Sequence, residues 1–76
     1  MKTYPLSKSI FRALGVRLTD TDPELYLHEY CLWNGSTRFI VGARDLTDVR
    51  RDADTGYRTA DAAISMAAAE LKMLGW

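Results

Sequence analysis

The sequence predicts a small α+β domain in which an antiparallel sheet, built around one hairpin, packs against a C-terminal helix. Two segments rich in aromatic and β-branched residues, 24–33 and 37–44, flank Asn34-Gly35, the strongest short-range signal for a β-hairpin. An alanine-rich helical pattern, 60–74, follows them, and a shorter one, 7–14, precedes them. At 76 residues, the chain has room for a single domain, residues 1–76.

Each expected helix has its own start and stop signals. Ser7 is placed to cap the first helix and Gly15 to end it. Thr59 and Gly75 do the same for the second helix, whose alanines favour helix intrinsically. The face of the second helix that should pack on the sheet consists of Ala60, Ala63, Ile64, Ala67, Leu71 and Leu74.

The segment between the hairpin 24–44 and the second helix is polar, with a turn signal at 52–56. Short apolar pieces lie on either side of that turn. We therefore expect one or two further short strands, at 49–52 and 57–59, to complete the sheet.

Two hairpin registers are open, and they bury opposite faces of the first strand, 24–33. In the favoured one, Gly35 is the left-handed residue of a three-residue loop. This register buries Leu25, Leu27, Cys31, Trp33, Phe39, Val41 and Ala43, and exposes Tyr26, His28, Tyr30, Arg38, Ile40 and Arg44. A two-residue type I′ turn would instead place Tyr26, His28, Tyr30 and Leu32 in the core with Phe39, Val41 and Ala43.

Composition excludes several classes. Ten basic and ten acidic residues give a formal net charge of zero, and 47% of the residues are hydrophobic, so the chain is not disordered. No run of 18 apolar residues is present, so we expect no membrane-spanning helix. The single cysteine, Cys31, excludes an internal disulfide.

No catalytic or metal-binding set emerges from the sequence. His28 is the only histidine, and in a strand it points away from the face that holds Cys31. Residues 52–56 resemble the start of a calcium loop, but Gly56 and Ala63 occupy positions that need oxygen ligands. We therefore expect a chain without enzymatic activity, cofactor or metal.

The candidate partner-binding residues lie on the hairpin face expected to be exposed. They are Tyr26, His28, Tyr30, Arg38 and Arg44, and tyrosine and arginine are enriched at protein–protein hot spots. A second, acidic patch comprises Asp20, Asp22 and Glu24. Met66 and Met73 on the second helix are a further soft surface that could contact a partner.

The order helix, hairpin, third strand, alanine-rich helix resembles the α-β-β-β-α double-stranded-RNA-binding domain. Leu25 and Leu27, Phe39 and Val41, Gly56 and the stretch 60–74 carry the resemblance, which covers nearly the whole chain. In that family a lysine cluster at the start of the last helix grips phosphates, whereas residues 59–63 here contain Asp61 and no lysine. The resemblance implies a nucleic-acid-binding alternative, carried by Arg38, Arg44, Arg50, Arg51 and Arg58.

In size and style the chain also resembles the small phage-borne inhibitors of the anti-CRISPR kind. That group shares no common sequence motif, so the resemblance rests on a single short domain with a strong hairpin and no catalytic set. It implies a protein that inhibits a bacterial defence complex, a CRISPR effector, by occluding one of its subunits in the cytoplasm of a bacterial host. A domain this small would also gain stability as a homodimer.

Overall fold

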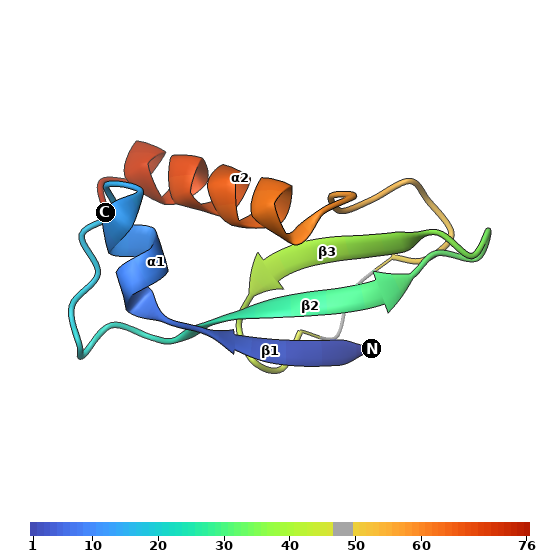
Figure 1. Cartoon of the computed structure of the whole chain (residues 1–76), viewed down its shortest axis with the longest axis horizontal. Coiled ribbons are helices and arrows are strands. Elements are labelled where there is room, and N and C mark those ends of the chain that lie inside the picture. The colour runs from blue at the N-terminus through green and yellow to red at the C-terminus, as the bar shows by residue number, and fades with distance from the viewer. Residues whose placement is uncertain (47–49) are drawn as a thin grey trace.

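The computed structural model describes residues 1–46 and 50–76. Its elements, in chain order, are β1 (Lys2–Leu6), α1 (Lys8–Ala13), β2 (Leu25–Cys31), β3 (Thr37–Gly42) and α2 (Ala60–Met73). The strands form one antiparallel sheet in the order β1-β2-β3, so β2 lies at its centre. Helix α2 covers one face of this sheet and α1 lies at one end of it (Figure 1). The α+β class, the hairpin and both helices are as predicted.

The hairpin turn settles the choice between the two registers. The Leu32 N–H donates to the Ser36 carbonyl at 2.8 Å, and the Gly35 N–H donates to the Leu32 carbonyl at 2.9 Å. Gly35 has a φ of +87°, so it is the left-handed residue of a three-residue loop. Leu27 consequently pairs with Val41. The favoured register is confirmed, and the type I′ alternative is wrong. Two residues that this register was expected to bury, Cys31 and Ala43, are nevertheless exposed.

The third strand is not where the sequence placed it. It is β1, at the N-terminus, which pairs with β2 from Lys2↔Glu29 to Leu6↔Leu25. Of the two strands expected after the hairpin, residues 50–52 are not a strand, residue 49 lies outside the described residues, and 57–59 contributes one bridge, Tyr57↔Phe39. The element order is therefore β-α-β-β-α, which differs from the α-β-β-β-α order of the double-stranded-RNA-binding domain.

Both helices begin and end as their flanking residues indicate. The Ser7 hydroxyl accepts from the Ser9 N–H, and the Thr59 hydroxyl accepts from the Ala62 N–H. Beyond α1, the Val16 N–H donates to the Phe11 carbonyl at 2.9 Å, which is the longer bond of a Schellman motif. That motif brings two core side chains together, because Phe11 and Val16 are both fully buried.

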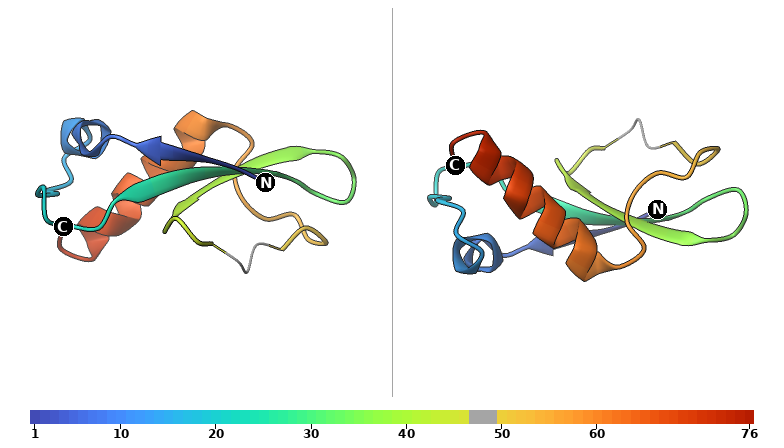
Figure 2. Two further views of the ribbon diagram at one scale, coloured as in Figure 1. Left: turned by 90° about the horizontal axis from the view of Figure 1, so that it is seen from below. Right: turned by 90° about the horizontal axis from the view of Figure 1, so that it is seen from above.

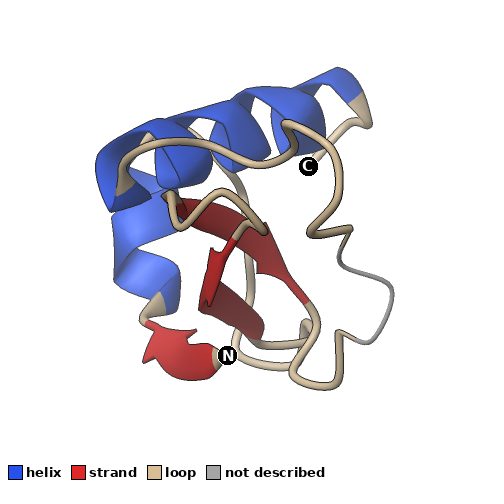
Figure 3. Ribbon diagram, turned by 90° about the vertical axis from the view of Figure 1, so that its right-hand side faces the viewer, coloured by secondary structure: helices blue, strands red, loops and turns tan. Residues whose placement is uncertain are grey.

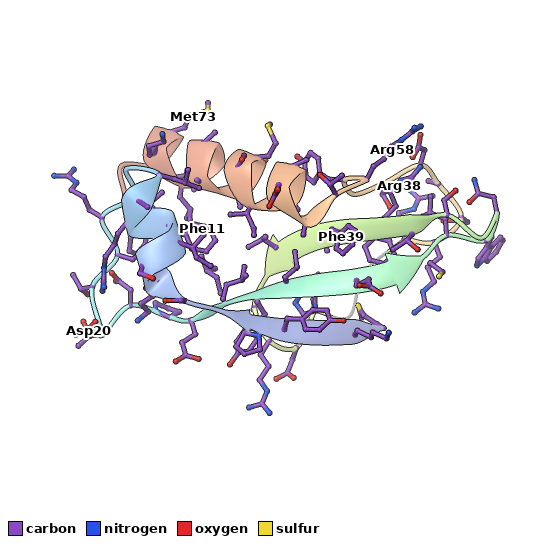
Figure 4. All side chains as sticks on the ribbon, in the orientation of Figure 1. Phe11, Asp20, Arg38, Phe39, Arg58 and Met73 are labelled. Atoms are coloured by element: carbon purple, nitrogen blue, oxygen red, sulfur yellow. The ribbon has the colours of Figure 1, made fainter. Side chains whose placement is uncertain are left out.

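The hydrophobic core lies between the sheet, α2 and the α1 region. Phe11, Val16, Leu18 and Ala68 form its buried centre, and Leu6, Leu25, Val41, Ile64, Ala67 and Leu71 pack around them. Figure 4 shows Phe11 between the two helices. Leu74, expected on the buried face of α2, is exposed, because it follows the last helical turn.

The opposite face of the sheet is covered by the β3–α2 connection, whose described parts are residues 43–46 and 50–59. We name the sheet face under α2 the helix face and the other the connection face. Figure 3 shows α2 on one side of the strands and the connection passing around the other. In Figure 2 the hairpin extends past the N-terminal end of α2. The central part of the sheet therefore lies between two unlike layers, one helical and one irregular, whereas β1 is exposed at the edge.

Candidate interaction surface

The five residues predicted to form an exposed binding surface lie on the connection face, as the register requires. Three of them are nevertheless buried, with exposed fractions of 1% for His28, 3% for Tyr30 and 7% for Arg38. The expectation that this face meets solvent is wrong, because the β3–α2 connection packs over it. Tyr26 is half-buried and Arg44 is exposed.

His28 joins three parts of the fold. Its Nε2 lies 2.7 Å from the Ala43 carbonyl oxygen in the connection, and its Nδ1 lies 3.1 Å from the Thr3 hydroxyl on β1. A carbonyl can only accept, so Nε2 carries a proton, and in the neutral ring Nδ1 accepts from the hydroxyl. Both ring nitrogens are satisfied inside the protein, and the exposed Cys31 lies on the other face of β2. His28 thus positions the connection on the sheet.

Tyr30 and Arg38 bind the far part of the connection. The Arg38 guanidinium donates to the Asp54 carboxylate at 3.0 Å, and the Tyr30 hydroxyl lies 3.4 Å from the Thr55 hydroxyl. The Arg38 side chain is 9% exposed, so removal of Asp54 would leave a buried cation without its anion. Substitution of Arg38 would accordingly perturb the fold rather than a solvent-facing contact.

The expected acidic patch is held within the loop that follows α1. Asp20 pairs with Arg12 at 3.0 Å, and the Asp22 carboxylate accepts from the Thr19 N–H at 2.6 Å. The Lys8 ammonium donates to the backbone carbonyls of Thr19, Asp20 and Asp22. One cation, Arg12, therefore pairs with a carboxylate of the patch, and a second, Lys8, lies against its backbone, so part of the negative charge is compensated locally. Figure 4 shows Asp20 at the end of the molecule opposite the hairpin turn.

Glu24 lies nearer the sheet than the other two acids. Its carboxylate accepts a 3.1 Å hydrogen bond from the Tyr26 hydroxyl. This hydrogen bond, together with desolvation and the negative charge of Glu24, raises the pKa of the Tyr26 phenol, and Arg44 opposes the change. Tyr26, Glu24 and Arg44 thus form a small polar group at the surface, separate from the buried part of the connection face.

Among the described residues, Trp33 at the hairpin turn is the most exposed large aromatic residue, at 82%. The sequence interpretation placed Trp33 in the core, and this was wrong. The signal was present, since a three-residue loop consists of Trp33, Asn34 and Gly35, and a loop side chain points past the end of the sheet. We name the surface formed by Leu32, Trp33, Asn34 and residues 51–54 the hairpin-tip surface; these residues line a groove of about 200 Å³.

The hairpin-tip surface is well supported by backbone hydrogen bonds. The Trp33 N–H donates to the Arg51 carbonyl at 2.9 Å, which ties the turn to the β3–α2 connection. The Ser36 N–H donates to the Asn34 side-chain oxygen at 2.9 Å. Trp33 is thus a large apolar side chain presented to solvent on a backbone that is fixed on both sides.

The described residues show no group of three or more His, Cys, Asp or Glu side chains arranged to hold a metal ion. In the segment that resembles a calcium loop, Asp52 faces Arg50 at 3.4 Å and Asp54 faces Arg38. Over residues 1–46 and 50–76, neither helix is long and apolar enough to cross a membrane.

Comparison with known proteins gives no relative: no protein-family model, no curated protein and no solved structure matches the chain.

Proposed function

We propose that the chain is a non-enzymatic protein-binding domain that inhibits its partner by occlusion, with the hairpin-tip surface as its principal contact. The observation that carries the proposal is Trp33, a tryptophan that is 82% exposed at an ordered turn. Tryptophan is among the residues most enriched at binding hot spots, and a hot-spot side chain acts by docking into a pocket of the partner.

The chemistry around Trp33 fits a protein partner. Its indole would fill an apolar pocket, while Arg51 and Asp52 would supply the charged rim that surrounds such an anchor. Because the backbone of the turn is hydrogen-bonded on both sides, little conformational entropy is lost when the indole docks. Inhibition then requires only that the bound domain cover a surface the partner needs.

The partner class we propose is a subunit of a bacterial defence complex, a CRISPR effector, in the cytoplasm of a bacterial host. Its support is the resemblance in size and style to anti-CRISPR inhibitors. The nucleic-acid alternative loses one of its five arginines, since Arg38 is buried in an ion pair with Asp54. The binding experiment below distinguishes nucleic-acid binding from protein binding.

The experiment measures binding of the purified chain to reconstituted CRISPR effector complexes, with and without nuclease treatment. Trp33→Ala should weaken binding by about 30-fold or more, the effect of a hot spot worth about 2 kcal/mol. The matched control is Leu74→Ala, which removes another exposed large apolar side chain far from the turn and should leave the affinity unchanged. Equal effects of the two variants would remove the hairpin-tip surface from the proposal.

Fluorescence localises the contact independently. The chain has two tryptophans, so Trp76→Phe leaves Trp33 as the sole indole and Trp33→Phe leaves Trp76. On binding, the emission of the Trp76→Phe variant should shift to the blue, because its indole leaves water, and that of the Trp33→Phe variant should not. Binding that vanishes on nuclease treatment and falls steeply with salt would favour the nucleic-acid alternative instead.

A further inference from the structure

The outer face of α2 carries an apolar stripe that points away from the sheet. It consists of Ala62, Met66, Ala69 and Met73, spaced four, three and four residues apart. Met66 and Ala69 are exposed, Met73 is 87% exposed, and Ala62 is half-buried. Figure 4 shows Met73 on the side of α2 remote from the strands. The sheet-facing residues of α2, which include Ala63, Ala67 and Leu71, lie on the opposite side of the helix.

Such a stripe has the spacing of a helix–helix seam. Alternating steps of four and three residues keep side chains on one line of a helix and are the pattern by which paired helices interlock. Alanine allows two helix backbones to approach closely, and methionine fills the remaining irregular gaps. A helix that packs on a sheet with one face ordinarily presents polar residues on the other. α2 instead has an unpartnered apolar seam.

The charges beside the seam indicate which helix it fits. Asp61 and Lys72 are exposed and lie on the same flank of the seam, eleven residues or about 16 Å apart along the helix. Among the described residues, neither forms an ion pair within the chain. In an antiparallel pair of identical helices each flank meets its own copy, so Asp61 of one chain would face Lys72 of the other, twice.

The two patterns share one centre. The midpoint of Asp61 and Lys72 and the midpoint of Ala62 and Met73 both fall within one residue of Ala67. A two-fold axis that passes near Ala67 would therefore bring the two apolar seams together and pair the charges at the same time. Antiparallel helices also have opposed dipoles, and a net charge of zero places no overall repulsion between copies.

We propose that the chain forms a homodimer in which α2 packs antiparallel against α2 of a second copy. The proposal is independent of the proposed function, because α2 and the hairpin-tip surface share no residue.

Sedimentation equilibrium over a wide range of protein concentration tests the dimer. The native chain should show a concentration-dependent approach to twice its mass of 8.6 kDa. Met73→Glu should weaken the association by about 100-fold or more, because it places a carboxylate in the apolar seam. Met73 is already exposed, so circular dichroism should show an unchanged monomer fold. Trp33→Glu, an exposed control outside α2, should leave the association unchanged.

Charge exchange tests the antiparallel arrangement. Asp61→Lys and Lys72→Asp should each weaken self-association by about tenfold, since each turns two attractions into repulsions. An equimolar mixture of the two variants, and the double variant Asp61→Lys/Lys72→Asp, should regain the native affinity. A monomer at every concentration would overturn the proposal. A dimer indifferent to Met73→Glu, or one that the double variant does not restore, would do the same.

Discussion

Replacement of Gly56 by alanine tests how closely the β3–α2 connection lies on the sheet. Gly56 has a φ of +77°, and a Cβ added there would fall far inside van der Waals contact with the Tyr30 hydroxyl and 3.1 Å from the Phe39 carbonyl oxygen. The left-handed backbone costs an L residue about 1–2 kcal/mol. Overpacking against the tyrosine adds about 1–3 kcal/mol. We therefore expect Gly56→Ala to lower the free energy of unfolding by about 2–5 kcal/mol.

Gly35 provides the matched control. Its φ is +87°, nearly that of Gly56, but a Cβ there would meet no atom within 4 Å. Gly35→Ala should therefore carry the backbone cost alone, about 1–2 kcal/mol. Urea unfolding followed by circular dichroism measures both variants on one scale. The difference between them isolates the steric contact of the connection with Tyr30.

A double-variant cycle identifies the contacting atom. Tyr30→Phe removes the hydroxyl, which is the atom nearest to the added Cβ, and alone should cost about 1 kcal/mol for its lost hydrogen bond. In the Tyr30→Phe background, Gly56→Ala should cost about 1–2 kcal/mol less than in the native chain. Equal losses for Gly56→Ala and Gly35→Ala, or strict additivity in the cycle, would refute the close packing of the connection.

Three further predictions concern other parts of the fold. Tyr30→Ala should lower the free energy of unfolding by about 3–5 kcal/mol and Trp33→Ala by less than about 0.5 kcal/mol, because the first side chain is buried and the second is not. Urea unfolding measures both, and the reverse order would contradict the burial described for both residues. Lys8→Met should lower the free energy of unfolding by about 2 kcal/mol, since three backbone carbonyls lose a charged hydrogen-bond donor. A melting temperature equal to the native one would show that water replaces this donor fully. Glu24→Gln should lower the alkaline pKa of Tyr26 in a spectroscopic titration, because the carboxylate favours the protonated phenol, and an unchanged titration would exclude that hydrogen bond in solution.

The local signals in the sequence predicted the elements that depend on them. Asn34-Gly35 predicted the position of the hairpin turn but left two registers open, and the favoured one, with Gly35 as the left-handed residue of a three-residue loop, is the one observed. The serine and threonine caps fixed where both helices begin. β1 carried no such signal: it is five residues long and contains Pro5, which weakens any strand pattern yet is tolerated at a sheet edge.

The candidate surface was predicted less well, because hydropathy does not report what covers a polar residue. His28 and Arg38 read as surface residues, but they are buried against acceptors of the connection, the Ala43 carbonyl and the Asp54 carboxylate. Those partners lie 15 and 16 residues away in the chain, and no local pattern joins them. The prediction for Trp33 was wrong in the opposite sense. Its apolar side chain suggested burial, but its position in the hairpin loop leaves it exposed.

The unlike layers on the two faces of the sheet restrict the alternative states open to the chain. If β3 shifted by one residue against β2, Arg38 would turn to the helix face and Val41 to the connection face. The displaced guanidinium would then lose its carboxylate in a nonpolar environment, a penalty of several kcal/mol, and the valine would leave its hydrophobic neighbours. A sheet that was equally hydrophobic on both faces would tolerate such a register shift. The polar network therefore widens the energy gap between the native hairpin and its nearest competitors, which favours a single, well-defined structure from a core of few residues.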